Sequence, residues 1–223
     1  MNKYKVFIAC DSTDISKINE IIEKTKNTKF KIGYKFGLEF FNSKYGRKFV
    51  SKLNNEIIFA DLKLHDIPNT CVSTIRALED LKVNYLTIHI SSGFEALKAA
   101  KKVCGKTKLI GVTILTSLDN KLLKQIGYDK NIMNVTKKQV MLAKKANLDA
   151  VVCSPKEVKI VRKIFKKEII TPGIRLNNYI NDQKRVLTPK EAFENGSDWI
   201  VIGRPITKGN ISKNLNNLIY NLE

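Results

Sequence analysis

The chain is poor in the residues that form disulfides or hold metals. It has 223 residues but only four cysteines and two histidines. The cysteines are widely spaced and form no C-x-x-C pair: Cys10, Cys71, Cys104 and Cys153. The chain is also too long for a small scaffold held together by disulfides. We therefore expect free, buried thiols. Because there is no H-E-x-x-H motif and no Cys/His cluster, we expect no metal site.

Long apolar runs are missing too. No stretch approaches the roughly 20 apolar residues that span a bilayer. The residues after Met1 lead into a short strand-like run, without an apolar segment that ends in a small-residue cleavage site. These absences predict a cytoplasmic protein without a membrane partner. No composition break or low-complexity linker divides the chain, so residues 1–223 are expected to form a single domain.

Acidic residues are scarce relative to basic ones. The chain has 40 Lys and Arg against 21 Asp and Glu, a net charge of +19. Such an excess can indicate nucleic acid, an anionic membrane or an acidic ligand. The lysines are scattered, however, and the densest clusters lack the interleaved aromatics on which bases stack: Lys101-Lys102, Lys137-Lys138 and Lys166-Lys167. We interpret the charge as a solvated lysine surface and expect no nucleic-acid partner, with a basic nucleic-acid-binding protein as the rival from another class.

Short apolar runs alternate with amphipathic segments along the whole chain. The expected strands are Tyr4–Cys10, Lys29–Gly33, Ile57–Leu62, Tyr85–Ile90, Leu109–Leu115, Ala150–Cys153, Glu168–Thr171 and Trp199–Ile202. The expected helices are Ile15–Lys24, Gly46–Leu53, Val72–Leu81, Phe94–Val103, Thr136–Ala146, Lys156–Phe165, Pro189–Glu194 and Ser212–Leu222. Thr136 and Ser212 are typical N-caps, and Pro155 and Pro189 suit first-turn positions.

Eight such units predict an α/β fold, a closed (β/α)₈ TIM barrel with a parallel sheet. An open, doubly wound sheet is the alternative. The first strand-to-helix junction, residues 9–13, speaks against it because it has no glycine-rich phosphate turn.

Charged residues follow the inner face of neighbouring strands. Asp61 lies on the third expected strand and Lys63 directly follows it; if the strand alternation continues, both share the face of Phe59. Lys31 lies on the second strand and Asp11 ends the first. Catalytic groups of these barrels sit at the carboxyl ends of the strands. A single Asp-x-Lys pair is usually solvated, but the charged residues on three neighbouring strands together predict one charged pocket.

Alternating Asp and Lys keep each other ionised, since opposite charges favour the charged forms. A lysine held protonated is a proton donor or an anion clamp. The lysines also take the places that a cation would occupy. The pattern therefore favours cofactor-free stabilisation of a carbanion, followed by its protonation.

An anion site is expected after the seventh and eighth strands, the customary phosphate site of such barrels. Thr171–Arg175 follows the seventh strand. After the eighth, Gly203 would let backbone N–H groups approach a phosphate, and Arg204 could bind it with two hydrogen bonds. The alternative is that these residues form only a strand-to-helix turn.

The segment from Asp61 to Thr70 resembles the signature D-x-K-x-x-D-I-P-x-T of the orotidine 5′-phosphate decarboxylases. Further motifs occur in the order of that family, in a form similar to its bacterial branch: Lys31–Gly33, Leu115–Ser117, Thr171–Arg175, Asp182–Arg185 and Gly203–Ile206. The resemblance implies a homodimer that converts orotidine 5′-phosphate to UMP and carbon dioxide, the last step of de novo UMP synthesis, without a cofactor.

The resemblance also implies roles for the charged residues. Lys63 would protonate C6, while Asp61 would lie against the substrate carboxylate and favour its departure. Lys31 would pair with Asp61 and touch the ribose. Asp66 would complete the array, and Asp66 and Thr70 would reach into the site of the partner subunit.

The remaining implied contacts bind the substrate. Asp11 would bind a ribose hydroxyl, and Thr116, with Ser117, would read the pyrimidine edge. The phosphate would be held by Gln183, Gly203 and Arg204, with Arg175 close by. The nearest rivals are keto-gulonate phosphate decarboxylases and hexulose phosphate synthases, which share D-x-K-x-x-D but use magnesium. Ile67–Thr70 and Asp182-Gln183 favour the nucleotide enzyme.

Overall fold

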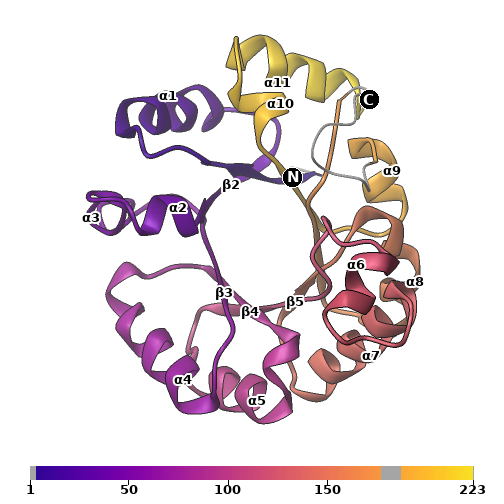
Figure 1. The fold of residues 1–223 in the computed structure, drawn as a ribbon. Coiled ribbons are helices and arrows are strands. Elements are labelled where there is room, and N and C mark those ends of the chain that lie inside the picture. The colour runs from indigo at the N-terminus through magenta and orange to yellow at the C-terminus, as the bar shows by residue number, and fades with distance from the viewer. Residues whose placement is uncertain (1–3, 177–186, 223) are drawn as a thin grey trace.

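The computed structural model describes residues 4–176 and 187–222. Eight parallel strands follow one another around a closed barrel, as Figure 1 shows from one end. The strands are β1 (Lys5–Ala9), β2 (Lys31–Gly37), β3 (Ile58–Leu64), β4 (Tyr85–His89), β5 (Lys108–Val112), β6 (Ala150–Val152), β7 (Glu168–Thr171) and β8 (Trp199–Ile202). The sheet closes where Val6 of β1 pairs with Ile200 of β8. The predicted (β/α)₈ barrel is therefore confirmed, and the open sheet is excluded.

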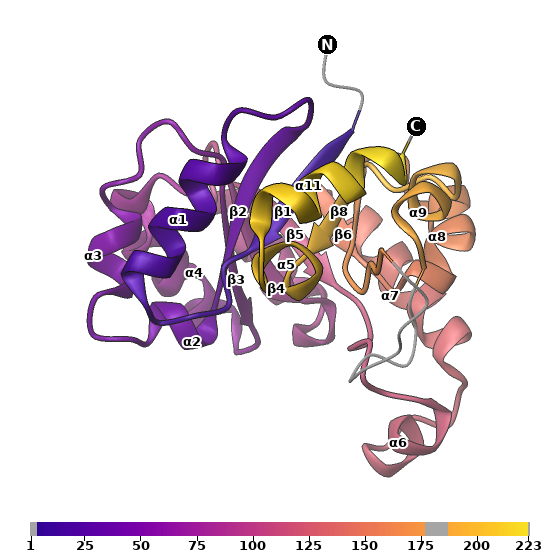
Figure 2. The ribbon, with the colours of Figure 1, turned by 90° about the horizontal axis from the view of Figure 1, so that it is seen from above.

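Helices form a ring around the barrel (Figure 1). They are α1 (Ile15–Thr25), α2 (Leu38–Phe41), α3 (Gly46–Val50), α4 (Pro68–Ala77), α5 (Phe94–Val103), α6 (Asn120–Gln125), α7 (Ile132–Lys145), α8 (Val158–Ile164), α9 (Pro189–Glu194), α10 (Arg204–Thr207) and α11 (Ile211–Tyr220). Short 3₁₀ turns add η1 (Glu79–Leu81), η2 (Ile90–Ser92) and η3 (Pro155–Glu157). Helix α6 projects away from the ring on the long connection between β5 and α7 (Figure 2).

Two predicted N-caps are wrong because an asparagine further upstream does the capping. Asn131 caps α7 and accepts a hydrogen bond from the N–H of Asn134, so Thr136 lies buried inside the helix. Asn210 caps α11 in the same way. Asn caps as well as Ser or Thr, and each amphipathic pattern begins at these earlier residues. The two prolines are confirmed as first-turn residues, Pro155 in η3 and Pro189 in α9.

Aromatic side chains fill the inside of the barrel. Phe7 stacks on Trp199 with ring centroids 4.1 Å apart, and Phe59 and Tyr85 meet Phe7 edge-on. A Cβ at Gly33 would lie 2.6 Å from the Phe7 ring, so glycine is required there. This plug closes the lower part of the barrel. The space for a ligand lies on the other side of this aromatic layer, at the carboxyl ends of the strands.

All four cysteines are buried thiols that form no disulfide within the described residues, as expected. Within the described residues, no helix has the length and apolarity needed to cross a membrane. The same part of the chain contains no cluster of three His, Cys, Asp or Glu side chains with the geometry of a metal site.

Candidate active site

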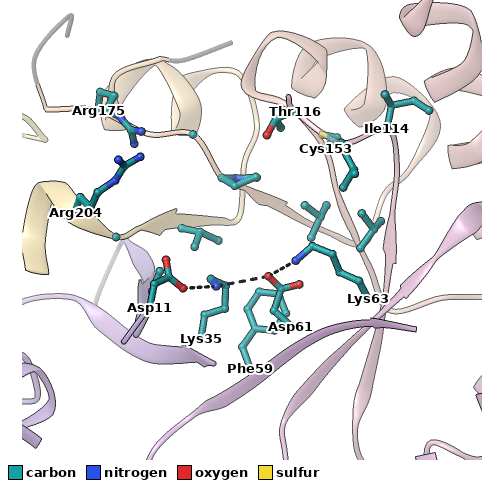
Figure 3. Close-up of a pocket in the computed structure, with 18 residues that line it drawn as sticks. Asp11, Lys35, Phe59, Asp61, Lys63, Ile114, Thr116, Cys153, Arg175 and Arg204 are labelled. Atoms are coloured by element: carbon teal, nitrogen blue, oxygen red, sulfur yellow. Dashed lines mark hydrogen bonds and ion pairs between the residues drawn. The ribbon is translucent and has the colours of Figure 1, made fainter. Parts of the chain in front are cut away.

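A cavity of about 290 Å³ opens at the carboxyl ends of the strands. Most of the expected site residues line it (Figure 3). Its charged and polar lining comprises Asp11, Lys35, Asp61, Lys63, Thr116, Arg175 and Arg204. The residues come from separate strands and the loops that follow them, as in other barrels of this type.

The assignment of Lys31 to this site is wrong, and Lys35 takes its place. Strand β2 runs to Gly37, four residues further than expected. Lys31 pairs with Lys5 at the amino end of the strands and is exposed, whereas Lys35 pairs with Ala9 at the carboxyl end. Residues four apart on a strand share a face but lie about 13 Å apart. Alternation alone therefore could not distinguish the two lysines.

The sequence did contain a signal for Lys35. It has a second Lys-x-Gly triplet, Lys35–Gly37, which directly precedes the residues of α2. A catalytic lysine at the carboxyl end of a strand should stand close to the start of the next helix. Of the two triplets, only the second meets that condition.

Four side chains form a row of alternating charge, which we call the charge row: Asp11, Lys35, Asp61 and Lys63. Nζ of Lys35 lies 3.1 Å from Oδ1 of Asp11 and 3.6 Å from Oδ2 of Asp61. The same Asp61 oxygen lies 2.8 Å from Nζ of Lys63 (Figure 3). The side chains of Lys35 and Asp61 are each only 13% exposed, so these charges compensate one another where water cannot.

The two buried charges of the row hold each other ionised. Burial by itself would raise the pKa of Asp61, but the ammonium groups of Lys35 and Lys63 outweigh it and the pKa is lowered. Burial would likewise lower the pKa of Lys35, but the carboxylates of Asp61 and Asp11 raise it. Both groups therefore stay charged at neutral pH.

Lys63 has an unusual backbone. Its φ is +49°, in the left-handed region, and β3 leaves its regular register against β4 between Ala60 and Leu64. Such a bulge re-aims a side chain at the end of a strand. In spite of it, Lys63 still meets Asp61, as the alternation of the sequence predicted.

Asp66 and Thr70 do not reach the cavity of their own chain. Asp66 is exposed at the rim, where its Oδ1 accepts a hydrogen bond from the N–H of Ile67. Thr70 is exposed in the first turn of α4. Their predicted role in the site of a second subunit stays a prediction.

The far end of the cavity is suited to an anion. Arg175 and Arg204 extend toward each other there, across the cavity from Lys63 (Figure 3). Gly203 lies beside them, and a Cβ on it would come within 3.3 Å of Ala9. Two guanidinium groups beside an accessible backbone favour a phosphate. Gln183, which was expected here, lies outside the described residues.

The rest of the cavity lining is mostly apolar. It includes Phe59, Ile114, Val152 and Pro172, with Thr116 among them. A flat ring with one polar edge suits such a surface. Ser117 is exposed and does not line the cavity, so of the predicted pair only Thr116 is in place.

Comparisons with known proteins agree with this geometry. Residues 4–213 match the family described as "Orotidine 5'-phosphate decarboxylase / HUMPS family". Orotidine 5′-phosphate decarboxylases of Wolbachia pipientis subsp. Culex pipiens and of Wolbachia sp. subsp. Brugia malayi are 46% and 44% identical, over 91% and 96% of both chains.

Solved structures extend the likeness to the fold. The crystal structure of orotidine 5′-phosphate decarboxylase from Lactobacillus acidophilus superposes with a TM-score of 0.84 and 31% identity, covering 99% of each chain. With the Wolbachia relatives and the matched residues, this similarity settles the assignment. The chain belongs to the orotidine 5′-phosphate decarboxylase / HUMPS family.

Proposed function

We propose that this protein decarboxylates orotidine 5′-phosphate to UMP and carbon dioxide, the last step of de novo UMP synthesis, without a metal or organic cofactor. The charge row is the observation that carries the proposal. It faces an arginine-lined anion end across one cavity. Relatives of this name at 40–46% identity support the same enzyme. The cytoplasmic location stays a prediction from the sequence.

In the proposed reaction, the bond between C6 and the carboxylate breaks and its electron pair stays on C6. Asp61 lies against the departing carboxylate and favours its loss as neutral carbon dioxide. Nζ of Lys63 then gives its proton to C6 and regains one from water. Lys35 keeps Asp61 ionised, because its ammonium group lies 3.6 Å from Oδ2.

The rest of the cavity would bind the substrate away from the reacting carbon. Arg175, Gly203 and Arg204 would hold the phosphate together with Gln183, and Asp11 would accept a hydrogen bond from a ribose hydroxyl. Thr116 would contact the pyrimidine edge. Binding energy from a remote phosphate can be used to organise the distant reacting atoms.

The proposal includes a homodimer. Asp66 and Thr70 are exposed beside Ile67, an apolar side chain that is 66% exposed at the rim of the barrel. Buried against a second copy, Ile67 would lose this exposure, and the two polar residues would enter the neighbouring site. Asp66 would then complete the charge row of the partner.

The test is the absorbance change of orotidine 5′-phosphate during turnover, measured in the presence of EDTA. We expect full activity with EDTA and no activity on sugar phosphates. Turnover only with added magnesium, or only with a sugar phosphate, would move the chain to the sugar-phosphate branch and overturn the proposal.

The basic surface is checked by a gel shift at physiological ionic strength, where duplex binding unaffected by UMP would indicate a second activity.

A further inference from the structure

One buried hydroxyl, that of Thr87, is hydrogen-bonded to two residues of the charge row but does not line the cavity. Thr87, in the middle of β4, is fully buried. Its Oγ1 lies 2.8 Å from the backbone nitrogen of Lys63 and 3.1 Å from Oδ1 of Asp61. It is not among the residues that line the cavity. Thr87 therefore connects the two residues that perform the proposed chemistry without reaching the substrate.

The backbone explains why a hydroxyl is needed here. Ala60 pairs with Leu86 and Leu64 with Ile88, so β3 advances four residues where β4 advances two. The residues in between leave the regular ladder. The N–H of Lys63 then needs another acceptor, because an unpaired buried N–H costs free energy comparable to a lost hydrogen bond. Thr87 supplies it, at the residue whose φ is +49°.

The direction of the two hydrogen bonds is fixed by chemistry. The backbone N–H of Lys63 can only donate, so Thr87 accepts from it through a lone pair. The single hydroxyl proton of Thr87 is then free to point at Oδ1 of Asp61, which accepts. This bond occupies the carboxylate oxygen that the lysines do not use.

The carboxylate of Asp61 is therefore held at both oxygens. Oδ1 accepts a hydrogen bond from the hydroxyl of Thr87. Oδ2 accepts one from Nζ of Lys63 at 2.8 Å and lies 3.6 Å from Nζ of Lys35. Because the hydrogen bond from Thr87 holds Oδ1, Oδ2 points toward the ammonium groups of Lys63 and Lys35 at the cavity. A hydrogen bond to the ionised form also favours that form.

We propose that Thr87 is a positioning residue of the decarboxylation, a role that rests on the function proposed above. It holds the left-handed backbone of Lys63, and thereby the place of its ammonium group, and it orients the carboxylate of Asp61. The competing explanation is that Thr87 only fills space inside the barrel. The two explanations differ for a substitution that keeps the shape and removes the hydroxyl.

Thr87→Val is that substitution, and Thr87→Ser is its matched control, which keeps the hydroxyl and loses a methyl group. We expect Thr87→Val to lower kcat by about 10- to 100-fold, because a misplacement of a reacting group by about 1 Å can cost about 100-fold in rate. KM and the affinity for UMP should stay within about twofold of the wild type, since the anion end is untouched. Thr87→Ser should keep most of kcat.

The pH profile gives a second readout. Without the hydrogen bond from Thr87, the ionised form of Asp61 is less favoured, so the acid limb of kcat in Thr87→Val should move to higher pH. If this variant fails to fold by circular dichroism, Thr87→Ala replaces it in the same measurements.

The outcomes separate the two proposals. If the wild type does not turn over orotidine 5′-phosphate, the proposed function fails and the role of Thr87 fails with it. If the wild type is active and Thr87→Val keeps its kcat and pH profile, only the positioning role is overturned. Equal losses in Thr87→Ser and Thr87→Val would overturn it too, because they would indicate packing.

Discussion

Nζ of Lys63 lies 2.8 Å from Oδ2 of Asp61, two residues earlier on β3. On a regular strand, these side chains would rise side by side from Cα atoms roughly 6–7 Å apart. Here the two side chains form a close ion pair at the mouth of the barrel, although the backbone at Lys63 is left-handed. The proposed proton donor therefore sits beside the carboxylate that would favour loss of carbon dioxide.

We expect Lys63→Ala to fold normally and to lose the chemical step. Asp61 keeps its second ammonium neighbour, Lys35, so its charge stays compensated. Removing a general acid typically costs about 10²- to 10⁴-fold in rate. The measurement is kcat by absorbance at saturating orotidine 5′-phosphate, together with the affinity for UMP as a control for folding. Normal turnover in this variant would remove Lys63 from the proposed role.

The two lysines of β2 provide a matched pair of substitutions. Lys35→Ala takes an ammonium group away from both Asp11 and Asp61 and should abolish most activity. Lys31→Ala changes the same strand and the same face but at its exposed amino end, so kcat and KM should stay within about twofold of the wild type. The check is kcat/KM for both variants under one condition. A larger loss in Lys31→Ala than in Lys35→Ala would contradict the site as described.

Stability should depend on pH through the charge row. The pKa of Asp61 is lowered, so its contribution to the free energy of unfolding is complete above about 3.9, its ordinary value, and is lost as pH falls through the lowered pKa. The pKa of Lys35 is raised, so its contribution is complete below about 10.4 and is lost as pH rises through the raised value.

Asp61→Asn tests this dependence. At pH 7 it removes the carboxylate that lies between two ammonium groups and leaves the buried Lys35 with the largely exposed Asp11, so it should lower the free energy of unfolding by about 3 kcal/mol. As pH falls below about 3.9 toward the lowered pKa, the wild type loses the contribution of Asp61 and the gap between the two proteins should narrow. Urea unfolding at several pH values measures it. A gap that stays constant down to pH 3 would contradict the assignment of the shift to Asp61.

The fold was predictable because the signals for it are local and repeated. Each strand is a short apolar run, and the bounds of β7, β8, α5 and α9 agree with the expectation. The short helices α2, α6 and α10 were not expected, because four to six residues show little periodicity; α9 is as short as α6, but Pro189 marks its first turn. The end of β2 was misplaced: the expected strand stops at Gly33, whereas β2 continues to Gly37.

Site residues were predictable where the pattern within a single strand was enough to place them. Asp61 and Lys63 needed only the alternation of β3, and Gly203 and Arg204 only their place after β8. Lys35 was missed because choosing between two lysines on one face requires the length of β2. Thr87 was missed because its contacts follow from the bulge in β3, which no pattern within β4 records.

Mixing two inactive variants tests whether the sites are shared between subunits. Asp66→Ala would remove a residue that a chain gives to its partner, and Lys35→Ala a residue of the chain's own charge row. In a mixed dimer, one site carries both defects and the other neither. Random mixing makes half of the dimers mixed, so about a quarter of the wild-type activity should return. The measurement is the recovery of turnover after the variants exchange subunits, with Lys35→Ala mixed with itself as the control. No recovery, with mixed dimers demonstrated by mass spectrometry, would mean that each subunit completes its own site.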